Sequence, residues 1–253
     1  MLQRPTAMDP QAARHAIYFT PEPDHPLQLR AACWLGRSPQ ATEPFGARPG
    51  GLAVSPAEIA EITTDPARYG FHATLKAPFR LRPEHSVAAL DRDVEHLASR
   101  YVRFVIERLE IGWIGGALAL VYVGCHELLS SLAFEAVLRL DRYRAPLQRH
   151  DVDRRLAAGL TPRQEELLNL HGYPYVAEQF RFHMTLTNDL SDHPLASQAL
   201  DAVNEWFGPV LAEPLPFDAI SRFEQPTRDN PMLELRRFPL NGAVGGRMRR
   251  GSQ

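Results

Sequence analysis

One five-residue pattern, Phe-His-x-Thr-Leu, occurs once in each half of the chain, at residues 71–75 and 182–186. In both copies, polar and apolar residues alternate with the period of a half-buried β-strand. The apolar residues of such a strand face a core, and the histidine and the threonine share the opposite face. The fold must therefore accommodate two strands that each carry a His-Thr pair on the more open side.

Similar elements follow each copy of the pattern. An amphipathic helix is predicted at about residues 84–100 after the first copy and at about 194–207 after the second. Two β-rich runs come next, at residues 102–111 and 118–123 in the first half and at 217–224 and 232–238 in the second. Gly115 and Gly116 between the first two runs predict a hairpin. This repeated order indicates an internal duplication.

A duplication of this kind predicts an α+β fold with two lobes related by a pseudo-twofold axis. Each lobe would hold an antiparallel-rich sheet with helices outside, and both motif strands would face one central cleft. We predict a single bilobal domain at residues 1–240. Residues 241–253, rich in Gly and Arg, are expected to form a disordered tail.

The remaining elements are predicted from their start and stop signals. A strand is expected at residues 15–20, a helix at 26–35 that ends at Gly36, and a loop at 38–54. Capping boxes at Ser55 and Thr161 each precede a proline, so they should open helices, the first ending before residue 65 and the second at Gly172. A further helix is expected at 127–144, whereas the pattern of residues 142–160 is ambiguous.

Composition excludes several classes of function. The net charge is −2, whereas proteins that grip long nucleic acids usually have a basic excess. Neither of the two cysteines, Cys33 and Cys125, has a zinc-ligand or redox spacing, so a reducing cytoplasm is the expected location. No stretch is apolar enough for a signal peptide or a membrane span. A small anionic ligand in a local basic pocket is compatible with these values.

The two histidines suit phosphodiester cleavage, which needs one group to take a proton from the nucleophile and another to give one to the leaving oxygen. Histidine titrates near neutral pH, so His72 and His183 can hold opposite protonation states. In-line displacement places nucleophile and leaving group on opposite sides of phosphorus, as two facing histidines would require. Thr74 and Thr185, each two residues further on, could donate a hydrogen bond to a non-bridging oxygen.

Two cations on the same strand faces extend these pairs. Lys76 lies four residues after His72, and Arg181 lies two residues before His183. Lys76 is the only lysine among 28 Lys and Arg residues, which favours a local need for a compact point charge. We therefore predict that Lys76 and Arg181 contact the phosphate. The simpler interpretation of Lys76 is a surface cation.

Other catalytic chemistries find little support. The sequence has no His-Glu-x-x-His or comparable zinc pattern, no Gly-x-Ser-x-Gly nucleophile elbow and no phosphate-binding glycine loop. Asp189, Asp192 and His193 lie near His183, but this cluster is more typical of a turn and a helix cap. We expect no metal and no cofactor.

The two motifs and their flanking residues resemble those of a known protein superfamily. Residues 69–79 (YGFHATLKAPF) and 180–187 (FRFHMTLT) resemble the two-histidine phosphoesterase superfamily, which includes 2′,5′-RNA-ligase-like proteins and cyclic nucleotide phosphodiesterases. Residues 16–19 and 34–36 are similar to its phosphonate-metabolism-associated branch, and the resemblance covers roughly residues 14–240. It implies a bilobal fold, metal-free cleavage of a cyclic phosphodiester, acid–base roles for His72 and His183, and phosphate-holding roles for Thr74 and Thr185. Tyr18 and Tyr69 lie in these segments and are further candidates for substrate contact.

Three functions stay open at this stage. The leading hypothesis is a cyclic phosphodiesterase that opens a 2′,3′-cyclic nucleotide or a ribosyl cyclic phosphate. The second is RNA end processing or 2′,5′ ligation, which would admit short RNA ends as partners. The third is a phosphate- or nucleotide-binding accessory protein, without catalysis, in a phosphonate-processing complex. Sequence leaves open the true substrate, the assignment of base and acid, and the oligomeric state.

Overall fold

A computed structural model of the chain describes residues 13–124, 127–157 and 159–242. In this part, seven strands form one sheet in the order β4-β5-β6-β2-β1-β8-β9, and every neighbouring pair is antiparallel. The strands are β1 Arg14–Phe19, β2 Ala73–Arg80, β4 Leu109–Ile114, β5 Ala117–Tyr122, β6 His183–Asp189, β8 Ala219–Gln225 and β9 Leu233–Pro239. A second, two-stranded sheet pairs β3 (Phe104–Ile106) with β7 (Leu215–Phe217). The predicted α+β class with antiparallel sheets is confirmed.

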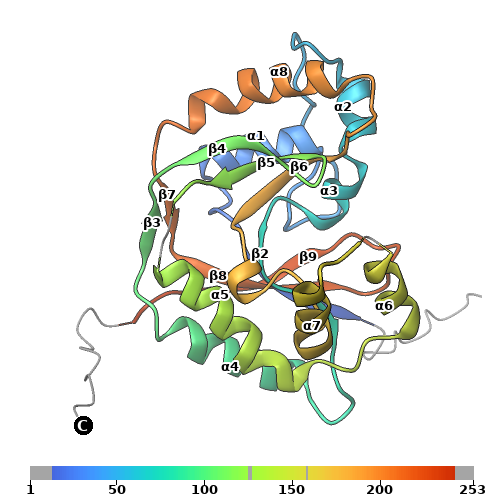
Figure 1. Cartoon of the computed structure of the whole chain (residues 1–253). Helices are drawn as coiled ribbons and strands as arrows, with labels where there is room; N and C mark the ends of the chain where they lie inside the picture. Colours follow the sequence, from blue (N-terminus) through green and yellow to red (C-terminus); the bar gives the residue numbers. More distant parts are fainter. Residues whose placement is uncertain (1–12, 125–126, 158, 243–253) are drawn as a thin grey trace, which may run out of the picture.

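The helices flank these sheets. Their bounds are α1 Pro26–Leu35, α2 Pro56–Ile62, α3 Thr64–Tyr69, α4 Val87–Ala98, α5 Glu127–Leu140, α6 Arg149–Leu156, α7 Pro162–His171 and α8 Ala196–Phe207. Helices α1, α2, α3 and α8 lie on the side of β4, β5 and β6, whereas α4, α5, α6 and α7 lie on the side of β8 and β9 (Figure 1). No helix in the described ranges has both the length and the apolar character needed to cross a lipid bilayer.

The topology repeats the duplication seen in the sequence. Each motif strand is followed by a helix, a short strand and a hairpin: β2, α4, β3, β4 and β5 in the first half, and β6, α8, β7, β8 and β9 in the second. The equivalent strands β2 and β6 pair with each other, as do the equivalent strands β3 and β7. Antiparallel pairing between equivalent elements is the arrangement that a twofold axis between two halves produces. The hairpins are exchanged, because β5 lies beside β6 and β8 lies on the β2 side, next to β1.

The predicted helix signals act as expected. Ser55 and Thr161 both form capping boxes, with Glu58 and Gln164 respectively returning the hydrogen bond. Helices α1 and α7 end at glycines in the left-handed conformation. One difference concerns Pro66, which was expected to lie beyond a helix but lies inside α3. It occupies the first turn, where a backbone N–H has no helical partner to lose.

Two other segments differ from expectation. The ambiguous residues 142–160 contain α6, and the helix expected to continue to 144 gives way to a 3-10 turn after Leu140. The first paired residue of β2 is Ala73, one position after His72.

Most of the predicted tail, residues 243–253, lies outside the described residues, as does Cys125. Cys33 forms no disulfide.

Aromatic residues fill the core where the two halves meet. Phe217 of β7 stacks on Phe19 of β1 at a centroid distance of 4.2 Å and on Phe104 of β3 at 4.6 Å. Trp34 of α1 is fully buried, and its indole N–H donates to the Leu186 carbonyl of β6 at 2.9 Å. These contacts join β1 and α1 to strands of both copies, so the position of each motif strand depends on the whole fold.

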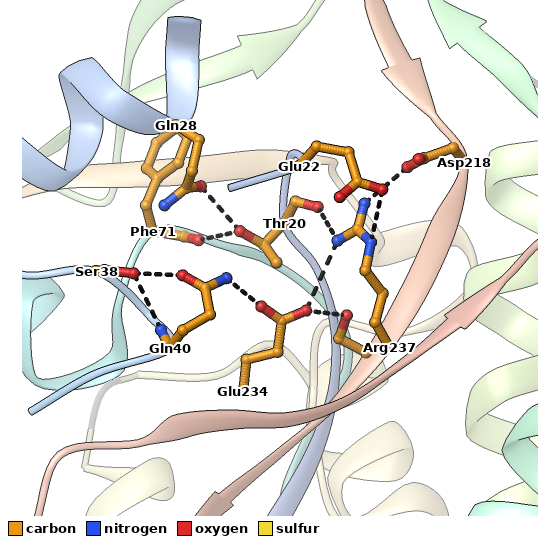
Figure 2. Close-up of polar contacts among 10 residues, drawn as sticks. Thr20, Glu22, Gln28, Ser38, Gln40, Phe71, Asp218, Glu234 and Arg237 are labelled. Carbon is orange, nitrogen blue, oxygen red and sulfur yellow. Dashed lines mark hydrogen bonds and ion pairs between the residues drawn. The ribbon is translucent and has the colours of Figure 1, made fainter. Parts of the chain in front are cut away.

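A polar network fixes the approach to the first motif (Figure 2). Arg237 of β9 pairs with Asp218 at 2.8 Å and donates to the Thr20 carbonyl at 2.8 Å. The Thr20 hydroxyl in turn contacts Gln28 at 2.9 Å and donates to the Phe71 carbonyl at 3.0 Å. The backbone immediately before the first histidine is therefore held by Thr20, just after β1, with support from side chains of α1 and β9.

A buried histidine outside the motifs predicts sensitivity to acid. His15 is 1% exposed, and neither ring nitrogen has a hydrogen-bond partner among the described residues. Burial, with a further effect of Arg222, lowers its pKa from 6.5 to about 4. Between these values the unfolded chain binds more protons than the folded one, so stability falls as the pH drops from 6.5 toward 4. We expect a loss of about 3 kcal/mol over this window, measured by urea unfolding.

The substitution His15→Leu removes this titrating group and should roughly halve the slope of this part of the pH–stability curve, because His72, whose pKa burial also lowers to about 4, contributes the remainder. His96→Leu, at an exposed position in α4, serves as the matched control and should keep the wild-type slope. An equally steep slope in His15→Leu would show that His15 is not the group responsible.

Candidate active site

The first motif histidine is held in one tautomer. His72 Nδ1 lies 2.8 Å from the carbonyl oxygen of Gly70. Because a carbonyl oxygen can only accept, Nδ1 carries the proton. In the neutral ring, Nε2 is then an acceptor, and the Thr74 hydroxyl lies 3.2 Å from it. A histidine in this state has a free lone pair with which to take a proton.

The second motif histidine uses the same device. His183 Nδ1 lies 2.8 Å from the carbonyl oxygen of Arg181, again two residues before the histidine. The same tautomer follows, with Nε2 as the nitrogen left for chemistry. The two motifs are thus equivalent in geometry as well as in sequence.

Strand pairing brings the two motifs together. Ala73 of β2 is directly opposite Met184 of β6, and both side chains are buried. Side chains alternate along a strand, so the two histidines and the two threonines next to this pair lie on the other face, where all four are half-buried. Antiparallel counting from this pair places each histidine across from the threonine of the other motif. The two histidines are therefore diagonal neighbours on this face. Diagonal neighbours have Cβ atoms roughly 7–8 Å apart, which leaves room for one phosphate between the two rings.

Electrostatics favour a neutral His72. Burial lowers its pKa from 6.5 to about 4, against the hydrogen bond to Gly70, and the charges of His183 and Arg37 lower it further. The Tyr18 ring stacks on the His72 ring, with centroids 3.7 Å apart and an interplanar angle of 19°.

A glycine and an arginine set the backbone that orients His72. Gly70 has φ 76° and ψ 167°, a region that is essentially reserved for glycine. A Cβ at this position would meet Pro39 at 3.0 Å. Beside it, the buried guanidinium of Arg37 donates to the carbonyls of Arg68 at 3.1 Å and Met232 at 2.7 Å. The carbonyl that accepts from His72 therefore has little freedom to move.

The second motif opens into a cleft of about 470 Å³. Its polar lining includes Thr74, Arg181 and His183, as predicted from the sequence. Its remaining walls were not predicted, and are formed by Trp113, Ile114, Gly115, Gln164, Tyr173, Tyr175, Gln179 and Phe180. Trp113 and Tyr175 are each 45% exposed, which is unusual for large aromatic residues and is the signal that marks them as candidates for ligand contact.

The two predicted tyrosines support the site from behind. Tyr18 is 1% exposed, and burial raises the pKa of its hydroxyl well above the usual range. It therefore backs the His72 ring and does not line the cleft. Tyr69 is half-buried and packs against a small cluster that contains Tyr18 and Phe223. Tyr18 contacts His72 directly, whereas Tyr69 packs against the cluster behind it.

The structure corrects the predicted position of Lys76. Its side chain is 3% exposed, and Nζ pairs with Asp141 at 3.2 Å and donates to the Val137 carbonyl at 3.3 Å. Lys76 is not among the residues that line the cleft. The strand continues past Thr74 under α5, so a side chain four residues after His72 is already inside the protein. The lone lysine links β2 to the end of α5 and has no direct access to a phosphate in the cleft.

A metal centre is not formed by the residues that the structure describes. Across these ranges, no group of three His, Cys, Asp or Glu side chains has a geometry that could hold a metal ion. Asp189 instead accepts hydrogen bonds from Ser191, as expected for a turn. The chemistry available at the cleft is proton transfer by histidine and hydrogen bonding by threonine and arginine.

Comparison with known proteins places the chain in a family. Residues 74–233, which include both motif threonines and the whole second motif, match the family described as "Protein of unknown function (DUF1045)". The chain belongs to the DUF1045 family. This description assigns no reaction, so function has to be argued from the site.

Two curated relatives carry a more specific name. The chain is 35% identical over 234 residues to the ribose 1,5-bisphosphate phosphokinase PhnN of Janthinobacterium sp. (strain Marseille), an alignment that covers 90% of this chain and 51% of the relative. It is 33% identical to the protein of the same name from Laribacter hongkongensis (strain HLHK9), covering 84% of this chain and 48% of the relative. The chain thus spans about half the length of the curated relatives it matches.

Solved structures with a similar arrangement include a phosphoesterase, the class that the paired motifs resemble, with a TM-score of 0.40 and 14% identity over 90% of this chain and 98% of the other. Another is E. coli LigT complexed with 3′-AMP, with a TM-score of 0.39 and 14% identity over the same shares. With TM-scores below 0.5, these two likenesses carry no inference about the reaction.

Proposed function

We propose that the chain is a metal-independent phosphodiesterase that opens a small cyclic phosphodiester by paired-histidine acid–base catalysis. The observation that carries this proposal is the matched geometry of His72 and His183. Each donates Nδ1–H to the carbonyl two residues before it. By the strand register the two are diagonal neighbours on one sheet face, where His183 and Thr74 line the cleft and half-buried His72 lies beside them, outside the residues that line it. Both rings therefore keep Nε2 for proton transfer to or from one bound phosphate.

The lowered pKa of His72 supports one division of roles. A ring that is neutral at pH 7 is suited to take a proton, so His72 is the base that deprotonates the attacking water. The water oxygen bonds to phosphorus, and the P–O bond to one ring oxygen of the cyclic ester breaks. Protonated His183 gives its Nε2 proton to that leaving oxygen. The cycle leaves His72 protonated and His183 neutral, and proton exchange with solvent resets the pair.

Neighbouring polar groups would hold the phosphate during this step. Thr74 lines the cleft, and Thr185 lies on the same strand face beside His72. Their hydroxyls can donate to the non-bridging oxygens as charge develops on them. Exposed Arg181 at the rim of the cleft adds the positive charge that the sequence assigned jointly to Arg181 and Lys76.

The walls of the cleft favour a nucleotide as the substrate. Trp113, Tyr173 and Tyr175 offer aromatic surfaces beside His183, and a nucleobase could stack on them. The curated relatives are named for ribose 1,5-bisphosphate, which agrees with a phosphorylated ribose at the reacting end. A 2′,3′-cyclic nucleotide combines both features, whereas a ribosyl cyclic phosphate has only the second.

Removing these aromatic walls should weaken binding more than catalysis. For Trp113→Ala and Tyr175→Ala we expect KM for 2′,3′-cyclic AMP to rise about tenfold each, because stacking on an aromatic side chain contributes about 1–3 kcal/mol per base. The turnover number should change by less than threefold. Leu138→Ala on α5, an exposed apolar residue outside the cleft lining, is the control and should leave both constants unchanged. Unaltered KM values in the two cleft variants would rule out base stacking at these walls.

The function is tested directly with EDTA-treated protein and 2′,3′-cyclic AMP, with the products followed by phosphorus NMR. We expect turnover to a single ring-opened monophosphate that EDTA does not reduce. A ribosyl cyclic phosphate assayed in parallel separates the two substrate classes. Tight binding without turnover of either compound would contradict the proposal and would favour a non-catalytic binding role.

A further inference from the structure

A second polar pocket lies at the far ends of β1 and β2, apart from the cleft that contains His183. It has a volume of about 30 Å³, room for roughly two waters, so it suits one compact group and not a ring or a base. Six arginines line it: Arg14, Arg80, Arg144, Arg154, Arg155 and Arg228. Asp151 of α6 is the carboxylate in the same lining.

Carboxylates neutralise only part of this charge. Asp151 is 7% exposed and pairs with Arg154 at 3.2 Å and, more closely, with Arg228. Arg144 is held by Asp141, with Nε 2.8 Å from a carboxylate oxygen. Two carboxylates thus serve these three arginines, and Asp141 also pairs with Lys76.

The other three arginines have none. Within residues 13–124, 127–157 and 159–242, no ion pair involves Arg14, Arg80 or Arg155. Arg14 donates from Nε to the neutral amide oxygen of Gln225 at 2.9 Å, and Arg155 donates to the Gly172 carbonyl. Both guanidinium groups are thus oriented by neutral acceptors, and their charges remain unneutralised.

The sheet register brings two of these unneutralised arginines close together. Arg14 and Arg80 are directly opposite each other in the antiparallel pairing of β1 and β2. Like charges at such positions destabilise a sheet unless an anion lies between them. Burial lowers the pKa of Arg155, and the charges of Arg154 and Arg14 lower it further against Tyr173 and Asp151. Arg155 and Arg14 are therefore close enough to repel each other.

One contact joins a wall of the pocket to a wall of the catalytic cleft. The Arg155 guanidinium lies 5.7 Å from the centre of the Tyr173 ring, and Tyr173 lines the cleft beside His183. Arg14 lies on the same strand as Tyr18, which stacks on His72. Four residues of extended strand separate Arg14 from Tyr18, a distance of about 13 Å. The two phosphates of one nucleotide lie closer together than this, so the Arg14 and Arg155 side chains have to leave Gln225 and Gly172 and cover the remaining distance.

We propose that the arginine pocket binds a dianionic phosphate group, the phosphomonoester at the end of the substrate opposite to the cyclic phosphodiester. Arginine forks bind phosphate oxygens in pairs, and three unneutralised arginines match the charge of one phosphomonoester. This inference rests on the proposed ring-opening reaction for the substrate, but the pocket's affinity for phosphate can be measured without that reaction. The preferred substrate class is then a 5′-phosphorylated 2′,3′-cyclic nucleotide.

The first measurement is calorimetric titration of the full chain with inorganic phosphate. We expect binding that Arg14→Gln/Arg80→Gln and, separately, Arg155→Gln each weaken about tenfold or more, because a hydrogen bond to a charged group contributes about 1.5–3 kcal/mol. Arg92→Gln/Arg108→Gln removes the same charge from exposed positions and should bind as the wild type does. His183→Ala reports any phosphate held in the cleft instead. Wild-type affinity in both pocket variants would overturn the proposal, whether or not the chain proves to be a phosphodiesterase.

The second measurement compares KM for 2′,3′-cyclic AMP with KM for the same compound carrying a 5′-phosphate. We expect a KM about tenfold lower for the phosphorylated compound in the wild type, and equal values in the Arg14→Gln/Arg80→Gln variant. Equal values already in the wild type, together with phosphate binding in the pocket, would identify a separate phosphate ligand and contradict the assignment to the substrate.

Discussion

His72→Ala and His183→Ala should each lower the turnover number for 2′,3′-cyclic AMP by about 10²–10⁴-fold, the usual contribution of a positioned acid or base. His72→Ala removes the Nε2 lone pair that takes the proton from water. His183→Ala removes the donor to the leaving oxygen. Because the two act on one phosphate in one step, the double variant should be little worse than either single variant. The measurement is steady-state turnover in EDTA-containing buffer.

A third histidine provides the matched control. His96 of α4 is exposed and lies outside the cleft, so His96→Ala should retain wild-type turnover. Urea unfolding of all variants separates loss of chemistry from loss of fold. Turnover within fivefold of wild type in a folded His72→Ala or His183→Ala protein would remove the paired-histidine mechanism.

The second large effect concerns the buried ion pair of the lone lysine. Asp141→Ala should cost about 3–5 kcal/mol of unfolding free energy, because it leaves Lys76 buried without a counter-charge. Arg144 loses its carboxylate in the same variant. Lys76→Met should cost less than about 1.5 kcal/mol, because methionine fills a similar volume and Asp141 keeps Arg144. The measurement is chemical denaturation at pH 7.

Turnover of the Lys76→Met variant decides between the two roles considered for this residue. A structural lysine predicts a turnover number within threefold of wild type, since Lys76 is 3% exposed and directed at Asp141. A drop of a hundredfold in a stably folded Lys76→Met protein would show that the ammonium group reaches the phosphate after all. Burial lowers the pKa of Lys76 to about 8, so the comparison is best made at pH 7, where the lysine is charged.

Local sequence signals predicted most of the fold. The capping boxes at Ser55 and Thr161, the glycine stops and the alternating motif strands are decided by neighbouring residues, and the structure has all of them. The repeated order of elements predicted that the two motif strands would face one cleft, but the direct pairing of β2 with β6 in one sheet was not predicted. The exchange of hairpins between the halves was not predictable, because strand order depends on contacts that no local pattern records.

The strand residues of the candidate site were proposed from the sequence, whereas the walls of the cleft were not. His72, Thr74, Thr185 and His183 follow from a period of two, which fixes the face of each side chain. The aromatic residues around His183 come from a hairpin and from the loop after α7, and only tertiary structure brings these together. Lys76 was misplaced for a related reason. The two-residue alternation predicted the strand face of Lys76 correctly. It does not show where along β2 the open cleft ends and where α5 begins to cover the strand.

The pH dependence of kcat/KM for 2′,3′-cyclic AMP, in the wild type and the two motif variants, tests the shared acid–base work most directly. The wild-type profile should be bell-shaped, with its acidic limb below the ordinary histidine value of 6.5, toward the pKa of about 4 that burial gives His72. The residual activity of His72→Ala should lose the acidic limb. Two variants that both keep the full wild-type bell would show that neither imidazole is the proton carrier.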